Sequence, residues 1–293
     1  MNSSLGITGA ILLAGILIIG VLVYSRSAGP ERASDEPRLQ HVHGLAVDIA
    51  NPNRLLIATH HGLFQLENET DLSRIGDVED DLMGFTPHPA DASVFFSSGH
   101  PVRGGNLGFQ KSIDGGVTWQ KLSDGINGPV DFHSMTVSAV NPDVVYGYYG
   151  DLQRSTDGGR TWEIARGTVQ PISLSSDPKR ESVVYAATQN GVMVSEDKAD
   201  TWKSLSPQLE GGAVSVFAID PAGEYALTYS LRLGGMGKST DGGATWQKLG
   251  ESFGGEAVLY IAYAKSEPRV YALTETNNIY KSTDTGETWS KIR

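Results

Sequence analysis

Cysteine and positive charge are the two clearest shortages of this chain. Among its 293 residues there is no cysteine, so disulfides, thiolate metal sites and a cysteine-linked lipid anchor are excluded. The 23 Lys and Arg residues are outnumbered by 34 Asp and Glu residues, the formal charge is −11, and no long run of Lys or Arg offsets it. Because such a surface repels a phosphate backbone, nucleic acid is not an expected partner.

Long apolar runs are also absent, with one exception at residues 5–24, LGITGAILLAGILIIGVLVY. These 20 uncharged and mostly apolar residues match the length needed to cross a hydrocarbon core of about 30 Å. A cleaved signal peptide is the competing interpretation. Against it, no Lys or Arg precedes the run, the run is longer than an ordinary signal core, and no clear A-x-A site follows. We therefore expect a retained single-pass transmembrane helix over residues 5–24, after a flank of residues 1–4.

The predicted helix implies contacts with the lipid bilayer and with other membrane proteins. Three small residues recur every four positions and form a smooth stripe: Gly6, Ala10 and Ala14. The stripe either packs against another transmembrane helix or reflects the frequency of Gly and Ala in any membrane helix. Residues 25–40, SRSAGPERASDEPRLQ, are typical of a polar tether. The arginines of the tether favour the cytoplasmic side, but large domains translocate regardless of this bias, and we expect a periplasmic or other extracytoplasmic domain.

A phrase that recurs five times, as in KSTDGGATWQKLG at residues 238–250, is the most informative feature of the chain. Its tryptophans are 43, 40, 44 and 43 residues apart, and a fixed period in this range indicates a repeat architecture. The recurring aspartates and tryptophans are Asp114, Asp157, Asp197, Asp241 and Asp284, with Trp119, Trp162, Trp202, Trp246 and Trp289. The pattern S-x-D-x-G-x-T-W resembles the Asp-box, or bacterial neuraminidase repeat, of sialidases, sortilin-type receptors and photosystem assembly factors. Over residues 41–293 this resemblance implies a β-propeller, but no particular activity, because these relatives do unrelated things.

Each position of the phrase has an expected structural role. The aspartate accepts hydrogen bonds from backbone amides just downstream and closes a turn. The two glycines supply conformations that a side chain would disfavour, and the tryptophan offers an apolar face to the adjoining sheet. The third copy, SEDKADTW, replaces both glycines, so we expect residues 195–202 to be the most strained copy.

The segments around each copy predict six units of four short strands. The units begin near His43, Met83, His133, Ser173, Ser215 and Leu259. The first unit lacks the phrase but keeps the order of strands, and the second is lengthened by an enlarged loop, GHPVRGGNLGFQ. Four strands in about 40–45 residues are typical of a propeller blade. We therefore predict an all-β, six-bladed β-propeller over residues 41–293, with the sixth blade meeting the first.

The histidines suggest a metal site. All seven lie between positions 41 and 133, and the blade plan places six on one rim: His41, His43, His60, His61, His100 and His133. Only His88 maps to the opposite face. Imidazole is the commonest metal ligand, so three or four rings could bind zinc, copper or iron, with Met83 as a soft partner or with a position open for substrate. Alternatively, the rings bond the backbone of the rim or meet a partner protein, since their spacing matches no compact metal motif.

Glycoside hydrolysis is a further hypothesis, because the Asp-box propeller is the sialidase scaffold. Sialidases of that family use three arginines, a tyrosine–glutamate pair and an acidic proton donor. Their early Arg-Ile-Pro-like phrase has no counterpart here, where residues 38–41 read RLQH. The other arginines weighed for this role lack a clear family context: Arg103, Arg154 and Arg232. Asp131 and Asp151 are either a carboxylate pair, which would need a separation of roughly 5–9 Å, or solvated rim residues.

The interpretation that we favour from the sequence is a non-enzymatic, membrane-anchored propeller. A rigid propeller face can recognise partners without catalysis, so the chain would be an accessory subunit or assembly factor of a larger membrane complex. A photosynthetic or other energy-transducing complex follows by analogy only. A metal-binding extracytoplasmic protein and a sialidase-like hydrolase are the two alternatives.

Overall fold

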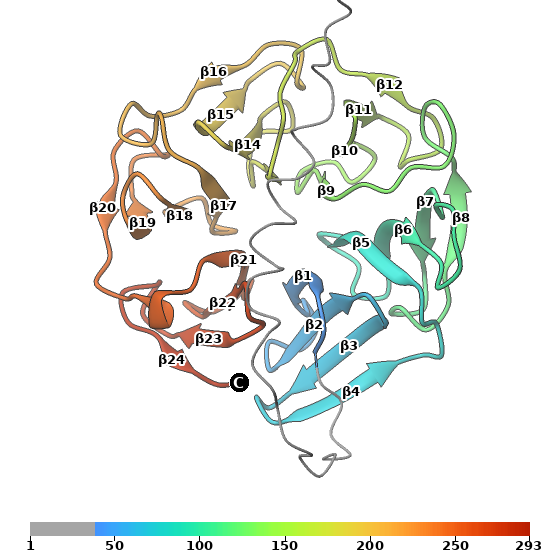
Figure 1. Ribbon diagram of the computed structural model, residues 1–293, viewed down its shortest axis with the longest axis horizontal. Coiled ribbons are helices and arrows are strands. Elements are labelled where there is room, and N and C mark those ends of the chain that lie inside the picture. The colour runs from blue at the N-terminus through green and yellow to red at the C-terminus, as the bar shows by residue number, and fades with distance from the viewer. Residues whose placement is uncertain (1–38) are drawn as a thin grey trace, which may run out of the picture. The chain divides into compact units, whose positions relative to one another are not determined.

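The computed structural model describes residues 39–293, which form six four-stranded antiparallel sheets around a central axis (Figure 1). Blades 1 to 3 comprise β1 (Val42–Val47), β2 (Arg54–Thr59), β3 (Gly62–Glu67), β4 (Asp71–Ile75); β5 (Asp81–Pro87), β6 (Phe95–His100), β7 (Phe109–Ser112), β8 (Gln120–Ser123); β9 (Ser134–Val137), β10 (Val145–Tyr149), β11 (Asp151–Ser155), β12 (Glu163–Ile164). Blades 4 to 6 comprise β13 (Ser173–Ser176), β14 (Val184–Thr188), β15 (Gly191–Ser195), β16 (Lys203–Ser204); β17 (Val214–Ile219), β18 (Ala226–Ser230), β19 (Gly235–Ser239), β20 (Gln247–Lys248); β21 (Val258–Tyr263), β22 (Val270–Thr274), β23 (Ile279–Ser282), β24 (Ser290–Lys291). The predicted all-β, six-bladed propeller is confirmed.

Every blade is built from four consecutive strands, with its first strand facing the centre in Figure 1 and its fourth at the outside. The six predicted unit starts all fall within two residues of the start of a first strand. Within residues 39–293, the only helix is the short η1 (Phe253–Gly255), and no helix is long and apolar enough to cross a membrane. The predicted membrane span and its flank, together with all of the tether up to residue 38, lie outside the described residues.

The recurring phrase forms the same turn in all five copies, between the third and fourth strands of a blade. In the second copy, Asp157 Oδ1 accepts hydrogen bonds from the amide of Thr161 at 2.9 Å and from the hydroxyl of Ser155 at 2.8 Å. Asp157 Oδ2 accepts from the Thr161 hydroxyl at 2.7 Å, while Ser155 Oγ accepts from the Gly159 amide at 2.8 Å. The Thr161 bonds lower the pKa of Asp157 to about 2, so the carboxylate holds the turn across the whole neutral range. These hydrogen bonds close the turn, which is the role expected of the aspartate.

The third copy adopts this turn without glycine. Lys198 and Ala199 have φ of 61° and 70°, the left-handed region that the paired glycines occupy in the copies that carry both. The Ala199 amide still donates to Ser195 Oγ at 2.8 Å, so the hydrogen bonds hold the strained backbone in place. The strain expected at residues 195–202 is thus present. The fifth copy carries a milder form of it, with Thr285 alone at φ 59°.

The hydrophobic core consists of clusters between neighbouring blades. The Trp162 ring of blade 3 packs edge-on against Phe109 of blade 2, with ring centroids 5.1 Å apart. The Trp162 indole N–H donates to Ser123 Oγ of the same preceding blade at 2.8 Å. Tryptophans of the phrase therefore join adjacent sheets, as the sequence predicts.

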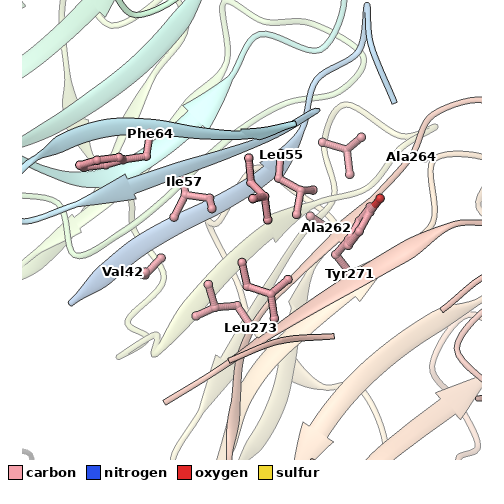
Figure 2. Packing of buried hydrophobic residues seen from close by; sticks show 11 residues of the cluster. Val42, Leu55, Ile57, Phe64, Ala262, Ala264, Tyr271 and Leu273 are labelled. Carbon is pink, nitrogen blue, oxygen red and sulfur yellow. The ribbon is translucent and has the colours of Figure 1, made fainter. Parts of the chain in front are cut away.

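The ring closes by side-chain packing between blades 6 and 1, because no strand is exchanged between them. Across this seam, Asn277 Oδ1 accepts from the Val42 amide at 3.4 Å, and Lys281 forms an ion pair with Glu69. Figure 2 shows apolar side chains of blade 1 facing those of blade 6: Val42, Leu55, Ile57 and Phe64 against Ala262, Ala264, Tyr271 and Leu273. The ring therefore closes between the sixth and the first blade, as the sequence predicts.

Candidate metal centre between blades 1 and 2

Three imidazoles surround one buried carboxylate at the axial end of blades 1 and 2. Asp81, the first residue of β5, is only 3% exposed. Its Oδ2 lies 3.1 Å from His60 Nδ1 and 3.1 Å from His100 Nε2, and its Oδ1 lies 3.5 Å from His43 Nε2. Ligand atoms of His43, His60 and Asp81 all lie within 4.8 Å of one another, which is a separation that a single metal ion can bridge.

Local backbone geometry explains how these side chains meet. His60 sits in the tight turn between β2 and β3, and its amide donates to the His41 carbonyl at 3.3 Å. A β-bulge between Val42 and Gly44 places His43 out of the regular ladder, and bulges re-aim side chains. His100 ends β6 directly opposite Asp81 in the β5–β6 register. The ring centroid of His60 lies 4.9 Å from that of His41 and 4.4 Å from that of His43, so four of the six predicted rim histidines gather here.

The buried polar atoms of this cluster are not satisfied by hydrogen bonds. Among residues 39–293, neither carboxylate oxygen of Asp81 has a hydrogen-bond partner, and His43 Nε2 is likewise buried without one. The histidine nitrogens lie close to the Asp81 oxygens, but their arrangement does not meet the geometry of a hydrogen bond. Buried polar groups are almost always paired, and a buried bare carboxylate is especially unfavourable. A bound cation would satisfy all of these atoms at once.

The protonation states suit metal ligation. Burial, followed by the neighbouring His60, lowers the pKa of His43 to about 3, and burial also lowers the pKa of His60. Both imidazoles are therefore neutral at pH 7 and keep a free lone pair, as a metal ligand requires. Burial raises the pKa of Asp81 to about 6, so its carboxyl is ionised above that pH despite its surroundings.

The other three histidines lie outside this group of four. His133 hydrogen-bonds Asp131 through Nε2 at 3.1 Å, which raises its pKa, and it is not a member of the three-residue group of donors. His61 is exposed beside His60. His88 caps the turn after β5, where its Nδ1 accepts from the amides of Ala90 at 3.2 Å and Asp91 at 3.0 Å. The role of His88 is therefore structural.

The other blades show that the fold does not require histidine at these positions. In blade 4, Thr188 bonds the Gly191 carbonyl and the Asn190 amide as Thr59 does in blade 1, but the turn reads TQNG where blade 1 has THHG. The bulge at His43 recurs in blades 5 and 6, where serine and leucine take its place. The propeller architecture therefore does not require histidine at position 43 or 60.

Asp81 is the residue that sequence reasoning missed. It stands two positions before Met83, as His41 stands before His43 and Asp131 before His133. A His or Asp two positions before the predicted start of each of these three units is the sequence signal from which Asp81 could have been found. Met83 itself is buried and lies outside the three-residue group of nitrogen and oxygen donors.

The residues considered for hydrolysis do not gather. Asp131 is buried and bonded to His133, whereas Asp151 is exposed at the start of β11. Arg154 pairs with Glu163 at 2.6 Å and with Asp200 at 3.3 Å across the seam of blades 3 and 4. Arg103 and Arg232 are exposed in separate loops of blades 2 and 5. These positions give no arginine triad among residues 39–293.

The buried charge makes a prediction about stability and pH. Asp81→Asn should stabilise the metal-free protein at pH 7.5 by about 2–3 kcal/mol, because the ordinary pKa of 3.8 rises to about 6 in the fold. The folded carboxyl resists ionisation, so its unfavourable contribution develops between about pH 4 and pH 6 and is then constant. Thermal unfolding of both proteins in chelator at pH 4 and 7.5 tests this. An advantage of Asp81→Asn that persists unchanged at pH 4 would contradict it.

Comparison with known proteins gives distant similarities. No family model matches the chain, so membership of the Asp-box family stays a prediction. The chain is 28% identical over 241 residues to a probable oligoxyloglucan-reducing end-specific xyloglucanase of Neosartorya fischeri, covering 65% of this chain and 29% of that protein. It is 27% identical over 233 residues to a xyloglucanase of Hypocrea jecorina, covering 70% and 24%. The chain thus spans less than a third of these curated relatives.

Solved structures share the propeller fold. The GH74 enzyme of Niastella koreensis superposes with a TM-score of 0.66 at 14% identity, covering 86% of this chain and 45% of that one. YCF48 from Cyanidioschyzon merolae superposes with a TM-score of 0.53 at 16% identity, covering 86% and 84%. At such identities the likeness establishes the fold alone.

Proposed function

We propose that this propeller binds a transition-metal ion at the triad of His43, His60 and Asp81. The observation that carries this proposal is a buried carboxylate without hydrogen bonds, placed beside neutral imidazoles whose lone pairs are free. Structural need does not explain the triad, because the other blades fold without it. In metal-free protein the ionised Asp81 opposes folding, which is typical of a residue retained for a ligand.

The donor set restricts the metal. Two imidazoles and one carboxylate suit Zn²⁺, Cu²⁺ or Fe²⁺, whereas Mg²⁺ and Ca²⁺ prefer all-oxygen sites. His100 contacts Asp81 Oδ2 from the opposite strand and would position the carboxylate rather than complete the triad. Three protein ligands leave coordination positions open, as in sites where a metal acts on an exogenous ligand.

Elemental analysis tests the proposal directly. The full-length chain, purified without a histidine tag and loaded with Zn²⁺ or Co²⁺, should retain about one ion per chain after dialysis against metal-free buffer. With Co²⁺, the d–d absorption of a nitrogen–oxygen site should appear and saturate at one equivalent. Loss of the ion during dialysis, with no saturable spectrum, would contradict the proposal.

Glycoside hydrolysis is the second candidate, favoured by the similarity to two xyloglucanases. In that mechanism Asp81 would act as the general acid, because its raised pKa keeps a proton available near pH 6. The test is release of reducing sugar from xyloglucan and of aryl alcohol from a panel of aryl glycosides, with Asp81→Asn as the inactive variant. No turnover across the panel would remove this candidate.

The accessory-subunit interpretation stays a prediction. The likeness to YCF48 is one of fold, and the membrane segment on which this interpretation depends lies outside the described residues. Co-purification with membrane proteins in mild detergent would support it, and recovery of the full-length chain alone and monodisperse would count against it.

A further inference from the structure

The first strands of all six blades enclose a cavity of about 420 Å³ on the propeller axis. Its volume falls within the range of about 300–1,000 Å³ that is typical of small-molecule sites. His43 and His133 line it on the side of blades 1 and 3, and Ser173, Ser215 and Tyr260 line it on the side of blades 4 to 6. The cavity therefore shares His43 with the proposed metal triad, while the rest of its wall comes from residues outside the triad.

Within the described part of the chain, the wall of this cavity carries no Asp, Glu, Lys or Arg. Its polar side chains are hydroxyls and imidazoles, and the remainder are mainly apolar residues such as Phe85, Ile172 and Leu259. A charged ligand would lose its hydration without gaining an ionic partner from this wall, which is strongly unfavourable. The lining thus selects for an uncharged molecule that has both polar and apolar faces.

Several hydroxyls of the wall have no partner among the residues that the structure describes. Ser134 Oγ, Ser173 Oγ and Ser175 Oγ are buried and make no hydrogen bond there. The Tyr260 hydroxyl also makes none within residues 39–293, although burial, together with the charge of Asp81, raises its pKa and keeps it a donor. In contrast, Ser215 Oγ is already bonded to the Val258 carbonyl at 2.5 Å. Unmade hydrogen bonds of buried hydroxyls are unfavourable, so these four groups favour an occupant that pairs with them.

We propose that the axial cavity binds a small neutral polyhydroxylated molecule, of the size of a mono- or disaccharide. Its hydroxyls pair with Ser173, Ser175 and Tyr260, and its C–H faces contact the apolar wall. This site does not depend on the proposed metal triad, because its partnerless hydroxyls come from blades 3, 4 and 6 rather than from the blades that hold the triad. His43 both lines this cavity and belongs to the proposed metal triad.

Calorimetric titration of the full-length chain tests the cavity. The probes are xylose, glucose and cellobiose, with glucuronate and glucosamine as charged analogues of similar shape. At least one neutral sugar should bind saturably at one per chain, and the charged analogues at least tenfold more weakly. Tyr260→Phe and Ser173→Ala should each weaken the binding of that sugar by about 2–12-fold, which corresponds to the loss of one neutral hydrogen bond. Tyr149→Phe removes an exposed hydroxyl at the end of β10, outside the cavity, and should leave the affinity unchanged.

Two outcomes overturn the proposal: no saturable binding of any neutral probe, which would mean a cavity filled by water only, or equal affinity of wild type, Tyr260→Phe and Ser173→Ala. Repeating the titration on protein stripped with chelator separates this site from the triad. Sugar binding that survives in protein unable to retain a metal supports the cavity while the metal proposal fails. Metal retention without sugar binding supports the metal proposal, while the cavity proposal fails.

Discussion

Asp81→Asn should lower the affinity of the propeller for Zn²⁺ or Co²⁺ at least 100-fold without unfolding it. The substitution keeps the shape of the side chain but removes the one anionic donor of the triad. Since even loss of a group that only positions a ligand typically lowers metal affinity about 10–100-fold, loss of a ligand should exceed that range. Competition with a chromophoric chelator gives the dissociation constants, and circular dichroism confirms the fold.

Matched variants make this test specific. His43→Ala and His60→Ala should resemble Asp81→Asn, whereas His100→Ala should have a smaller effect of about tenfold, because His100 contacts the carboxylate from outside the triad. Asp131→Asn, the equivalent position in blade 3, should lower metal affinity far less than Asp81→Asn, because Asp131 acts on the triad only through its charge. An Asp81→Asn variant within threefold of wild type, or an equal loss in Asp131→Asn, would place the metal elsewhere.

Gly159→Ala should destabilise the propeller by about 3 kcal/mol or more, a large effect for a single methyl group. Gly159 has φ 84°, and a Cβ there would overlap the ring of Phe109 in the preceding blade. Left-handed strain and overpacking therefore add at one residue, and the ring cannot move without disturbing its contact with Trp162. The midpoint of urea unfolding, followed by tryptophan fluorescence, measures the change.

Gly115→Ala is the control for this prediction. Gly115 is the first glycine of another copy of the turn, with φ 72°, and a methyl group added to its Cα would meet open space. Only the backbone strain should remain, about 1 kcal/mol. Equal losses in the two variants would show that overlap with the neighbouring blade does not determine the stability of the turn.

The sequence predicts the architecture well because its signals are local and repeated. Spacing of the tryptophans fixes the period, and the hydrogen-bonding capacity of Asp157 and its counterparts fixes the turn. Even the strained backbone at Lys198 and Ala199 follows from the absence of glycine in one copy. The resemblance to the Asp-box family led to the same fold, and the structure provides the turn geometry behind it.

The candidate site could be predicted only in part. The blade plan brings the rim histidines to blades 1 to 3, but it does not say which rings touch. His43 and His60 converge because of a bulge and a tight turn, while His133 hydrogen-bonds Asp131. Asp81 is hard to single out from the sequence alone, because an aspartate before a strand is common. Only the three-dimensional fold shows that its carboxylate is buried without a hydrogen-bond partner among the described residues.

The most direct measurement is the position of a bound metal in a crystal of the full-length protein loaded with Zn²⁺ or Co²⁺. An anomalous difference map recorded at the absorption edge should show one strong peak within about 2.0–2.2 Å of His43, His60 and Asp81. A peak elsewhere, or an empty triad with hydrogen bonds newly formed around Asp81, would contradict a metal centre between blades 1 and 2.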